Sequence, residues 1–472
     1  MMGRAYILDS RGKPIASTQY RHVAKAGYDA AQTTNENSRH WSNADALDAI
    51  TANSVGTRKT LLNRSRYEVK NNCYARGIIN TLANDTIGTG PRPQVLSKDS
   101  DINARCEAAW TAWAHSVTLA EKLRTMRIAK GQDGEAFGIK FTNSALSPVS
   151  LDFRLIECDQ VTSPFAGATK YTDGIRFDAN GKPAGYYVLN GHPGIFTGRL
   201  DSGKEIAAEF IMHWFRTDRP GQIRGVPEIT PALPLFAQLR RYTLAVISAA
   251  ELAAEWTIFL HTNNNAGELV VDAGAENDFT TMEVERGMAT TLPEGWLADQ
   301  LKPEQPATTY DMFKKELLNE VARCFNMPYN IAAGNSSGYN YASGRLDHQT
   351  YYKYIAVEQS QCESVVLDDL FAEWLAEWRL VTGIPEDLPM PHQWMWEGHE
   401  HVDPAKEATA NQTNLASLST NLKRIYAARG LDWEAEIRQL GAEKTLLDKL
   451  NLTMAEIPAL PAPVPVKDDD DA

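Results

Sequence analysis

Only a few stretches of this sequence have residue types that could carry out chemistry, and the most suggestive is Gly334-Asn-Ser-Ser-Gly338. Its letters fit the Gly-x-Ser-x-Gly elbow that presents the nucleophile of serine hydrolases. That elbow needs a strand before the serine and a helix directly after it, whereas here a helical pattern precedes and a tyrosine-rich loop follows. We therefore predict no catalytic residue, and a serine hydrolase that uses Ser336 stays as the enzymatic alternative.

Histidines and cysteines form no recognisable metal site in the sequence. His392, His399 and His401 lie close together but lack the His-Glu-x-x-His spacing of a zinc site. The five cysteines are scattered without a Cys-x-x-Cys pair, which favours a reducing cytoplasm over a disulfide framework. No Gly-x-x-x-x-Gly-Lys-Ser/Thr motif is present to hold the phosphates of ATP. We predict neither a metal nor another cofactor.

Composition limits the classes of partner. The 472 residues are 43% hydrophobic, which is enough for two or three compact units. The formal charge of −13 argues against a protein that grips nucleic acid over its whole surface. The first ten residues have too short an apolar run for a signal peptide. The most apolar stretch, 244–260, is interrupted by Glu251 and Glu255, so we expect a packed helix and no membrane contact.

The elements that would position these groups centre on residues 310–380. Apolar residues recur every fourth position from Phe313 to Phe325, which predicts an amphipathic helix that ends near Pro328. Residues 330–344 are rich in glycine, asparagine and serine, which predicts an exposed loop. Residues 345–380 contain neither proline nor glycine, so a helix there could run for about 50 Å. We expect its polar first half to meet water or a polar lumen, and its apolar second half to meet a core.

The rest of the chain alternates between helical and strand periods. Residues 1–56 read as an arm, 57–87 as a helix, and 103–115 and 119–129 as further helices. Between 135 and 215 the period changes to two, and Asn180-Gly181 is a hairpin signal. This pattern predicts an α+β fold with an antiparallel sheet.

The second half begins with an alanine-rich helix. This helix, at about 235–260, is followed by a proline-broken segment whose residues 268–272 resemble a short strand. After the long helix, Pro404 starts one short helix, Gly430 caps another, and Asp432 opens a third. A proline-spaced acidic tail ends the chain and is expected to be disordered.

Several motifs together resemble the lambda-type portal proteins of tailed bacteriophages, which act as head–tail connectors. The most specific is Phe215-Arg-Thr-Asp-Arg-Pro-Gly-Gln-Ile-Arg-Gly-Val-Pro227. Shorter matches include Asn71-Asn-Cys-Tyr-Ala-Arg-Gly77, Gly134-Glu-Ala-Phe137, Leu155-Ile-Glu157, Phe325-Asn-Met-Pro328 and Asn340-Tyr-Ala-Ser-Gly-Arg345. The resemblance covers roughly residues 58–450.

The resemblance implies a portal-type protomer, with an antiparallel-sheet and helical wing, a helical stem, a small clip insertion, a long helix and a helical crown. Its parts would be an N-terminal arm (1–56), the wing (57–228), the first stem helix (229–260), the clip (261–307), the second stem helix (308–327), a channel loop (328–344), the long helix with its return to the wing (345–399), the crown (400–455) and the acidic tail (456–472).

The function that the resemblance implies is a ring-shaped channel at one capsid vertex, through which double-stranded DNA is packaged and ejected. Its implied partners are further copies of itself in a cyclic homo-oligomer, commonly a dodecamer, together with the terminase large subunit, the major capsid protein and scaffold, the head-completion or tail connector protein, and DNA without regard to sequence. Its location would be the virion, after assembly in the host bacterial cytoplasm. A capsid-associated protein without a channel is the other alternative.

Two sets of residues follow as candidate sites. The channel loop could touch DNA weakly through Asn335, Ser336, Ser337, Tyr339, Asn340, Tyr341 and Arg345. The signature loop before the stem would contain Arg219, Pro220, Gly221, Gln222, Arg224 and Gly225.

Overall fold

The structure is a computed structural model that describes residues 34–35, 38–164, 170–194, 202–254, 258–262, 296–300, 307–338, 340–398 and 404–451. The chain divides into two compact units, Met1–Ala52 and Asn53–Ala472. In the first unit the described residues include one short helix, α1 (Ala49–Ala52). The other described elements belong to the second unit.

Two three-stranded antiparallel sheets lie in the middle of this unit. One has the order β3-β2-β7, with β2 (Glu135–Thr142) between β3 (Leu151–Ile156) and β7 (Ile211–Phe215). The other has the order β4-β5-β6, formed by β4 (Ile175–Phe177), β5 (Pro183–Leu189) and β6 (Gly203–Ala207). The turn between β4 and β5 contains Gly181 at φ +77°. The predicted antiparallel sheet and hairpin are therefore confirmed.

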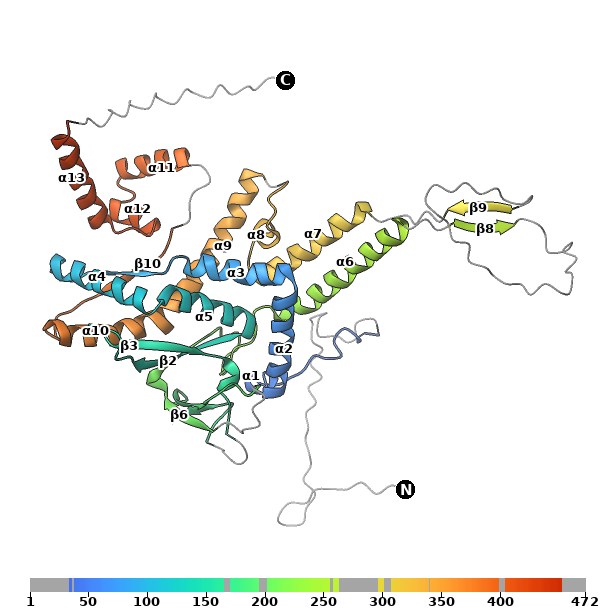
Figure 1. Ribbon diagram of the computed structural model, residues 1–472, viewed down its shortest axis with the longest axis horizontal. Coiled ribbons are helices and arrows are strands. Elements are labelled where there is room, and N and C mark those ends of the chain that lie inside the picture. Colours follow the sequence, from blue (N-terminus) through green and yellow to red (C-terminus); the bar gives the residue numbers. More distant parts are fainter. Residues whose placement is uncertain are drawn as a thin grey trace, which may run out of the picture. The chain divides into compact units, whose positions relative to one another are not determined.

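Helices cover the first sheet and surround a tryptophan-rich core. α4 (Ser100–Ser116), α5 (Leu119–Asp133) and α10 (Asp368–Thr382) contribute to it, and α5 packs along β2 (Figure 1). The indole of Trp110 packs edge-on against Trp374, with ring centroids 5.2 Å apart. β1 (Arg92–Val95) and β10 (His392–Met395) pair in an antiparallel ribbon beside this core.

A second core is mostly helical. It joins α2 (Val55–Asn71), α3 (Cys73–Ile87), the start of α6 (Leu233–Ala254), the end of α7 (Ala307–Cys324) and α9 (Tyr341–Cys362). The prediction of one helix over 57–87 is wrong at a single residue. Asn72 leaves the helical region at φ −120° and ψ 119°, and its side-chain oxygen accepts from the backbone N–H groups of Tyr74 and Ala75. An asparagine that caps a new helix is favoured over one inside a helix.

The long helix is continuous but not regular. A π-helical turn at Glu363–Leu367 joins α9 to α10. Two indoles from the β10 segment donate to carboxylates on this turn and its flank, Trp396 to Glu363 at 2.6 Å and Trp394 to Asp368 at 2.8 Å.

The expectation that the first half of the long helix meets water is wrong for one of its sides. Tyr351 and Ile355 have no exposed surface, and Glu358 is 1% exposed. The Tyr351 hydroxyl donates to Asp85 at 2.7 Å, so this polar side is buried together with its partners.

Residues expected to form the stem, clip and crown give several further elements. α6 and α7 pair through Tyr242 and Phe313, whose ring centroids lie 4.7 Å apart. Between these helices, β8 (Ile258–Thr262) pairs with β9 (Trp296–Gln300), while the strand predicted at 268–272 lies outside the described residues. α11 (Pro404–Ala416) starts at Pro404 and α13 (Trp433–Lys449) follows Asp432, as predicted. Gly430, at φ +72°, lies just after α12 (Leu422–Ala428), where a helix cap was expected. Most of the N-terminal arm and the acidic tail also fall outside the described residues.

None of the described helices combines the length and the apolar character that a membrane span requires.

Candidate functional site

The signature loop and the start of β2 meet at two glycines. Gly134 ends α5 with φ +89°, a conformation that favours glycine. A Cβ atom on Gly225 would lie 2.0 Å from the carbonyl oxygen of Gly134, and one on Gly134 would lie 2.4 Å from the backbone of Val226. Neither position has room for a side chain. The two backbone segments can therefore pack against each other only if residues 134 and 225 are both glycine.

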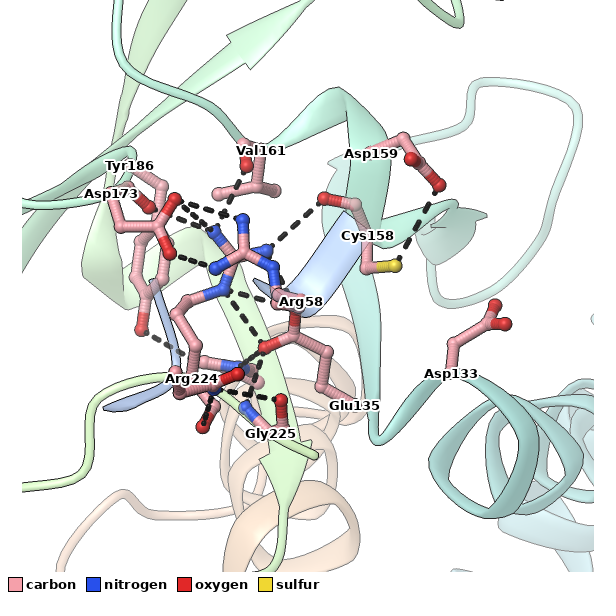
Figure 2. A network of polar contacts seen from close by, with 12 residues as sticks. Arg58, Asp133, Glu135, Cys158, Asp159, Val161, Asp173, Tyr186, Arg224 and Gly225 are labelled. Carbon is pink, nitrogen blue, oxygen red and sulfur yellow. Dashed lines mark hydrogen bonds and ion pairs between the residues drawn. The ribbon is translucent and has the colours of Figure 1, made fainter. Parts of the chain in front are cut away.

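Arg224 lies beside this contact and is 1% exposed. Its Nη2 and Nε donate to the carboxylate of Glu135 at 2.6 and 2.9 Å. The remaining hydrogens of the guanidinium reach backbone carbonyls of Val161, Asp173 and Cys158 at 2.8–3.1 Å. Figure 2 shows how these groups converge on the guanidinium from three separate segments, around Glu135, Cys158 to Val161, and Asp173. The planar guanidinium of arginine can donate to all of these acceptors at once, which the ammonium of a lysine could not do.

Charge and burial oppose each other at this ion pair. Burial alone would raise the pKa of Glu135, but the positive charge of Arg224 and hydrogen bonds from His213 and Arg224 outweigh it and hold the pKa below its usual range. Burial would likewise lower the pKa of Arg224, whereas Glu135 raises it overall. Both groups are therefore charged at neutral pH, and each satisfies the other in a region without water.

His213 completes the cluster from β7. Its Nε2 lies 3.0 Å from Glu135, and its ring stacks between Phe137 and Phe215 with centroids 4.2 and 4.4 Å away. Burial lowers the pKa of His213 more than the carboxylate of Glu135 raises it. The neutral ring, with its Nε2 proton directed at Glu135, is the form that this environment favours.

A second buried cluster joins the same loop to the long helix. Arg127 and Lys130 of α5 meet Glu228, just after the signature loop, and Glu358 of α9, with every side chain at most 2% exposed. Arg127 pairs with Glu228 at 3.0 Å and with Glu358 at 3.4 Å, and Lys130 donates to Glu358. Two positive and two negative charges balance here, so the cluster binds three elements together without leaving a net buried charge.

The side-chain amide of Gln222 holds the exposed half of the signature loop in place. The Gln222 side-chain oxygen accepts from the backbone N–H groups of Asp218 and Arg219, and its nitrogen donates to the carbonyls of Arg216 and Arg224. Gly221 supports the turn with φ +79°. Arg219 and Pro220 are exposed at its tip. Of the predicted signature residues, Arg224, Gly225 and Gln222 thus maintain the fold, and Arg219 and Pro220 face the surface.

The predicted channel loop is shorter than 328–344. Pro328 precedes a short helix, α8 (Tyr329–Ala333), and α9 begins at Tyr341, so Tyr341 is helical. A glycine in a helix costs only about 1 kcal/mol relative to alanine. Gly344 is buried in α9, so its packing there outweighs the preference of glycine for turns. Asn335, Ser336, Ser337 and Asn340 are exposed, Arg345 is exposed on α9, and Tyr339 lies outside the described residues.

The base of this loop is tied down on both sides. The side chain of Asn330 in α8 lies 3.2 Å from His348 Nε2 in α9, and His348 Nδ1 lies 3.3 Å from the Tyr352 hydroxyl. Ser337 N–H donates to Asn335 Oδ1 at 2.9 Å and closes a tight turn. The geometry presents a small polar tip on two anchored helices.

Within the part of the chain that the structure describes, the geometry supports neither enzymatic nor metal chemistry. Ser336 follows a helix and a glycine turn. A nucleophile elbow instead requires a strand before the serine. Glu157, Asp159 and His192 approach within 4.8 Å of one another, as metal ligands can. Arg66 already pairs with the same two carboxylates, at 2.8 Å from Asp159 and 3.6 Å from Glu157. Its positive charge occupies the place that a cation would take.

Taken together, these observations define an α+β protein in which buried ion pairs fix a loop at the start of a helix pair. A sequence profile described as "Phage portal protein, lambda family" matches residues 34–359. The chain therefore belongs to the lambda family of phage portal proteins, which are structural assembly components and not enzymes.

Individual relatives are distant. A probable portal protein of Halomonas phage phiHAP-1 is 25% identical over 296 residues, which span 59% of this chain and 56% of that relative. The solved neck of an empty GTA particle, computed with C6 symmetry, has a TM-score of 0.50 at 12% identity and covers 79% of this chain and 93% of its own. The virion of a native gene transfer agent particle gives a TM-score of 0.48 with the same identity and coverage.

We predict that Arg224→Ala destabilises the protein by about 3–5 kcal/mol, because Glu135 would remain charged and buried without its partner. Urea unfolding at fixed protein concentration, followed by tryptophan fluorescence, measures the change. Arg219→Ala, an exposed arginine of the same loop, is the matched control and should shift the free energy of unfolding by no more than about 0.5 kcal/mol. Equal costs for the two variants would contradict the assigned role of Arg224.

We also predict that stability falls between pH 7 and pH 5 because of His213. Its pKa in the folded state lies below the usual value of about 6.5, so the unfolded chain takes up this proton first as the pH drops. One such group contributes at most about 1.4 kcal/mol per pH unit in that window. His213→Gln places an amide nitrogen near the position of Nε2 and can still donate to Glu135, so its unfolding curve should lose this part of the slope. An unchanged slope would show that other groups cause the decline.

Proposed function

We propose that copies of this chain assemble into a ring around a channel, through which double-stranded DNA passes into and out of a phage head. Family membership supports a portal role. The observation that carries the ring is the apolar surface of the helix pair α6 and α7. Leu244 and Ile247 on α6 are 57% and 47% exposed, and Met312 and Phe313 on α7 are 63% and 49% exposed.

This exposed apolar surface indicates that α6 and α7 contact another molecule. Among the described side chains of α6 beyond Leu239, none is buried, although the helix continues to Ala254. Large exposed apolar residues gathered on one helix pair are typical of interaction surfaces. A neighbouring copy offers the same residues, and cyclic symmetry lets each copy cover the next. In the proposed ring, α6 and α7 are the two stem helices, and twelve copies are expected from the family resemblance.

The tip at 335–338 is proposed to face the channel and touch DNA. Tight non-specific binding, at about 5–8 kcal/mol, would stall a moving duplex. The exposed side chains of Asn335, Ser336 and Ser337 can form only weak polar contacts without regard to sequence, and Arg345 adds an occasional phosphate contact. The net charge of −13 per copy opposes lasting phosphate pairing.

The partners of the ring are proposed by the same reasoning. The segment between α6 and α7, which includes the β8–β9 hairpin, would be the clip that meets the terminase large subunit during packaging and the tail connector afterwards. The wing and crown would meet the major capsid protein and the scaffold. Assembly would take place in the host cytoplasm, and the mature ring would remain in the virion.

Negative-stain microscopy of the purified full chain tests the ring directly. We expect annular particles with a central hole. Particles that stay solitary under every condition that builds capsids would instead favour a capsid-associated protein without a channel.

We predict that deletion of 335–338 leaves rings intact but reduces the yield of DNA-filled heads, because the tip lies between two anchored helices and holds no core residue. The measurement is a packaging assay scored as protected DNA per head. Ser336→Ala is the matched control and should package normally, since single weak contacts are dispensable. Loss of ring formation on deletion would show that the tip is structural. Loss of an ester hydrolysis in Ser336→Ala would revive the hydrolase alternative.

A further inference from the structure

The helix pair α6 and α7 carries unpaired charges of both signs. Arg241 on α6 and Glu316 on α7 are exposed, and neither has an ion pair or a side-chain hydrogen bond within the part of the chain that the structure describes. The adjacent Arg240, by contrast, already lies over the ring of Tyr67 in its own chain, 5.7 Å from the ring centroid. Arg241 and Glu316 are therefore available to another molecule.

Helix geometry directs Arg241 away from α7. Within one copy, α6 meets α7 through Leu239, Tyr242 and Thr243. Successive residues of an α-helix are turned by about 100°, so Arg241 and Leu244 both lie about 150° from the middle of that side. These two side chains, one basic and one apolar, form the outward side of α6.

α7 turns a matching pair of side chains outward. Its contacts with α6 come from Tyr310, Phe313 and Leu317. By the same geometry, Met312 lies about 130° and Glu316 about 90° from the middle of that side. Met312 is 63% exposed, so α7 offers an apolar residue followed one turn later by an acidic one.

The contacts inside one copy also fix the heights of these side chains along the helix pair. Tyr242 packs against Phe313 with ring centroids 4.7 Å apart, and the two helices run antiparallel (Figure 1). At 1.5 Å per residue, Arg241 lies within about 6 Å of the height of Glu316. Because Cβ atoms tilt toward the N-terminus of their own helix, each of these two side chains leans toward the height of the other.

The apolar side chains follow the same order, one step further from the start of α6. Leu244 lies within about 5 Å of the height of Met312. A cyclic ring is generated by rotation alone, so each residue has the same height in every copy. Where α6 of one copy stands beside α7 of the next, the basic residue therefore faces the acidic one, and the apolar residue faces the apolar one.

We propose that Arg241 of each copy forms an ion pair with Glu316 of the next copy, beside a contact between Leu244 and Met312. The proposal rests on the ring proposed above and names the two surfaces that close it. The interface is heterologous, because the α6 side of one copy meets the α7 side of the next. Each copy therefore uses both sides, and a closed ring leaves neither side uncovered.

Charge reversal and charge exchange test this pairing in the full chain. Arg241→Glu and Glu316→Arg should each raise, at least about fivefold, the protein concentration at which half of the chains are in rings, because like charges then meet at every boundary. The double variant Arg241→Glu with Glu316→Arg should return this concentration to within about twofold of the unaltered chain. Mass photometry at fixed salt measures the fraction of chains in rings.

A variant of equal net charge is the matched control. Arg241→Glu with Glu209→Arg adds the same two charges, but Glu209 is an exposed residue just before β7, so this variant should not restore rings. Rings that tolerate both single reversals, or an exchange that restores nothing, would overturn the pairing while the ring itself stands. Absence of rings in the unaltered chain would overturn both the pairing and the ring.

Disulfide trapping tests the heterologous contact. Leu244→Cys and Met312→Cys are placed on separate chains, each with Cys73→Ser and Cys324→Ser, and the two chains are produced together. Mild oxidation of the mixed rings should yield a covalent dimer on a non-reducing gel, and rings of either variant alone should yield none. A dimer from one variant alone would show that the same side meets itself, and no dimer from mixed rings would show that these sides do not meet. Either result would overturn the proposal.

Discussion

The buried pairing of Arg224 with Glu135 is the interaction on which the rest of this protein depends. A charge without water is stable only when geometry supplies every hydrogen bond that water would have given, and here the guanidinium reaches one carboxylate and three carbonyls. These partners come from β2 and from the segment between β3 and β4, which leads into the second sheet. The pair therefore fixes the loop that leads into α6 with respect to both sheets.

The second charge cluster extends this constraint to the long helix. Glu228 follows the signature loop by only a few residues and shares Arg127 with Glu358 of α9. A movement at the start of α6 would have to break a buried ion pair or carry α9 with it. The start of α6 and helix α9 are thereby coupled through side chains that are almost fully enclosed.

Sequence reasoning succeeded here where the signal is local. The β4–β5 hairpin follows from Asn180-Gly181. Pro404, Gly430 and Asp432 mark the start of α11, the end of α12 and the start of α13. It failed where tertiary contacts decide the outcome. In the sequence, Tyr351 and Glu358 have the polar character of surface residues. In the structure they are buried because Asp85 and Lys130 are their polar partners. Glu135 and Arg224 were both within recognised motifs, but their pairing across 89 positions left no pattern in the sequence.

The π-helical turn explains how one long helix, α9 with α10, packs into two separate cores. Ile355 and Trp374 are both fully buried, yet they are 19 positions apart, which in a regular α-helix would place them about 100° out of line. The wider turn at Glu363–Leu367 absorbs one extra residue and returns Trp374 toward the side that Ile355 occupies. This local widening of the helix thus corrects its angular phase, so that one continuous helix buries the same side in both cores.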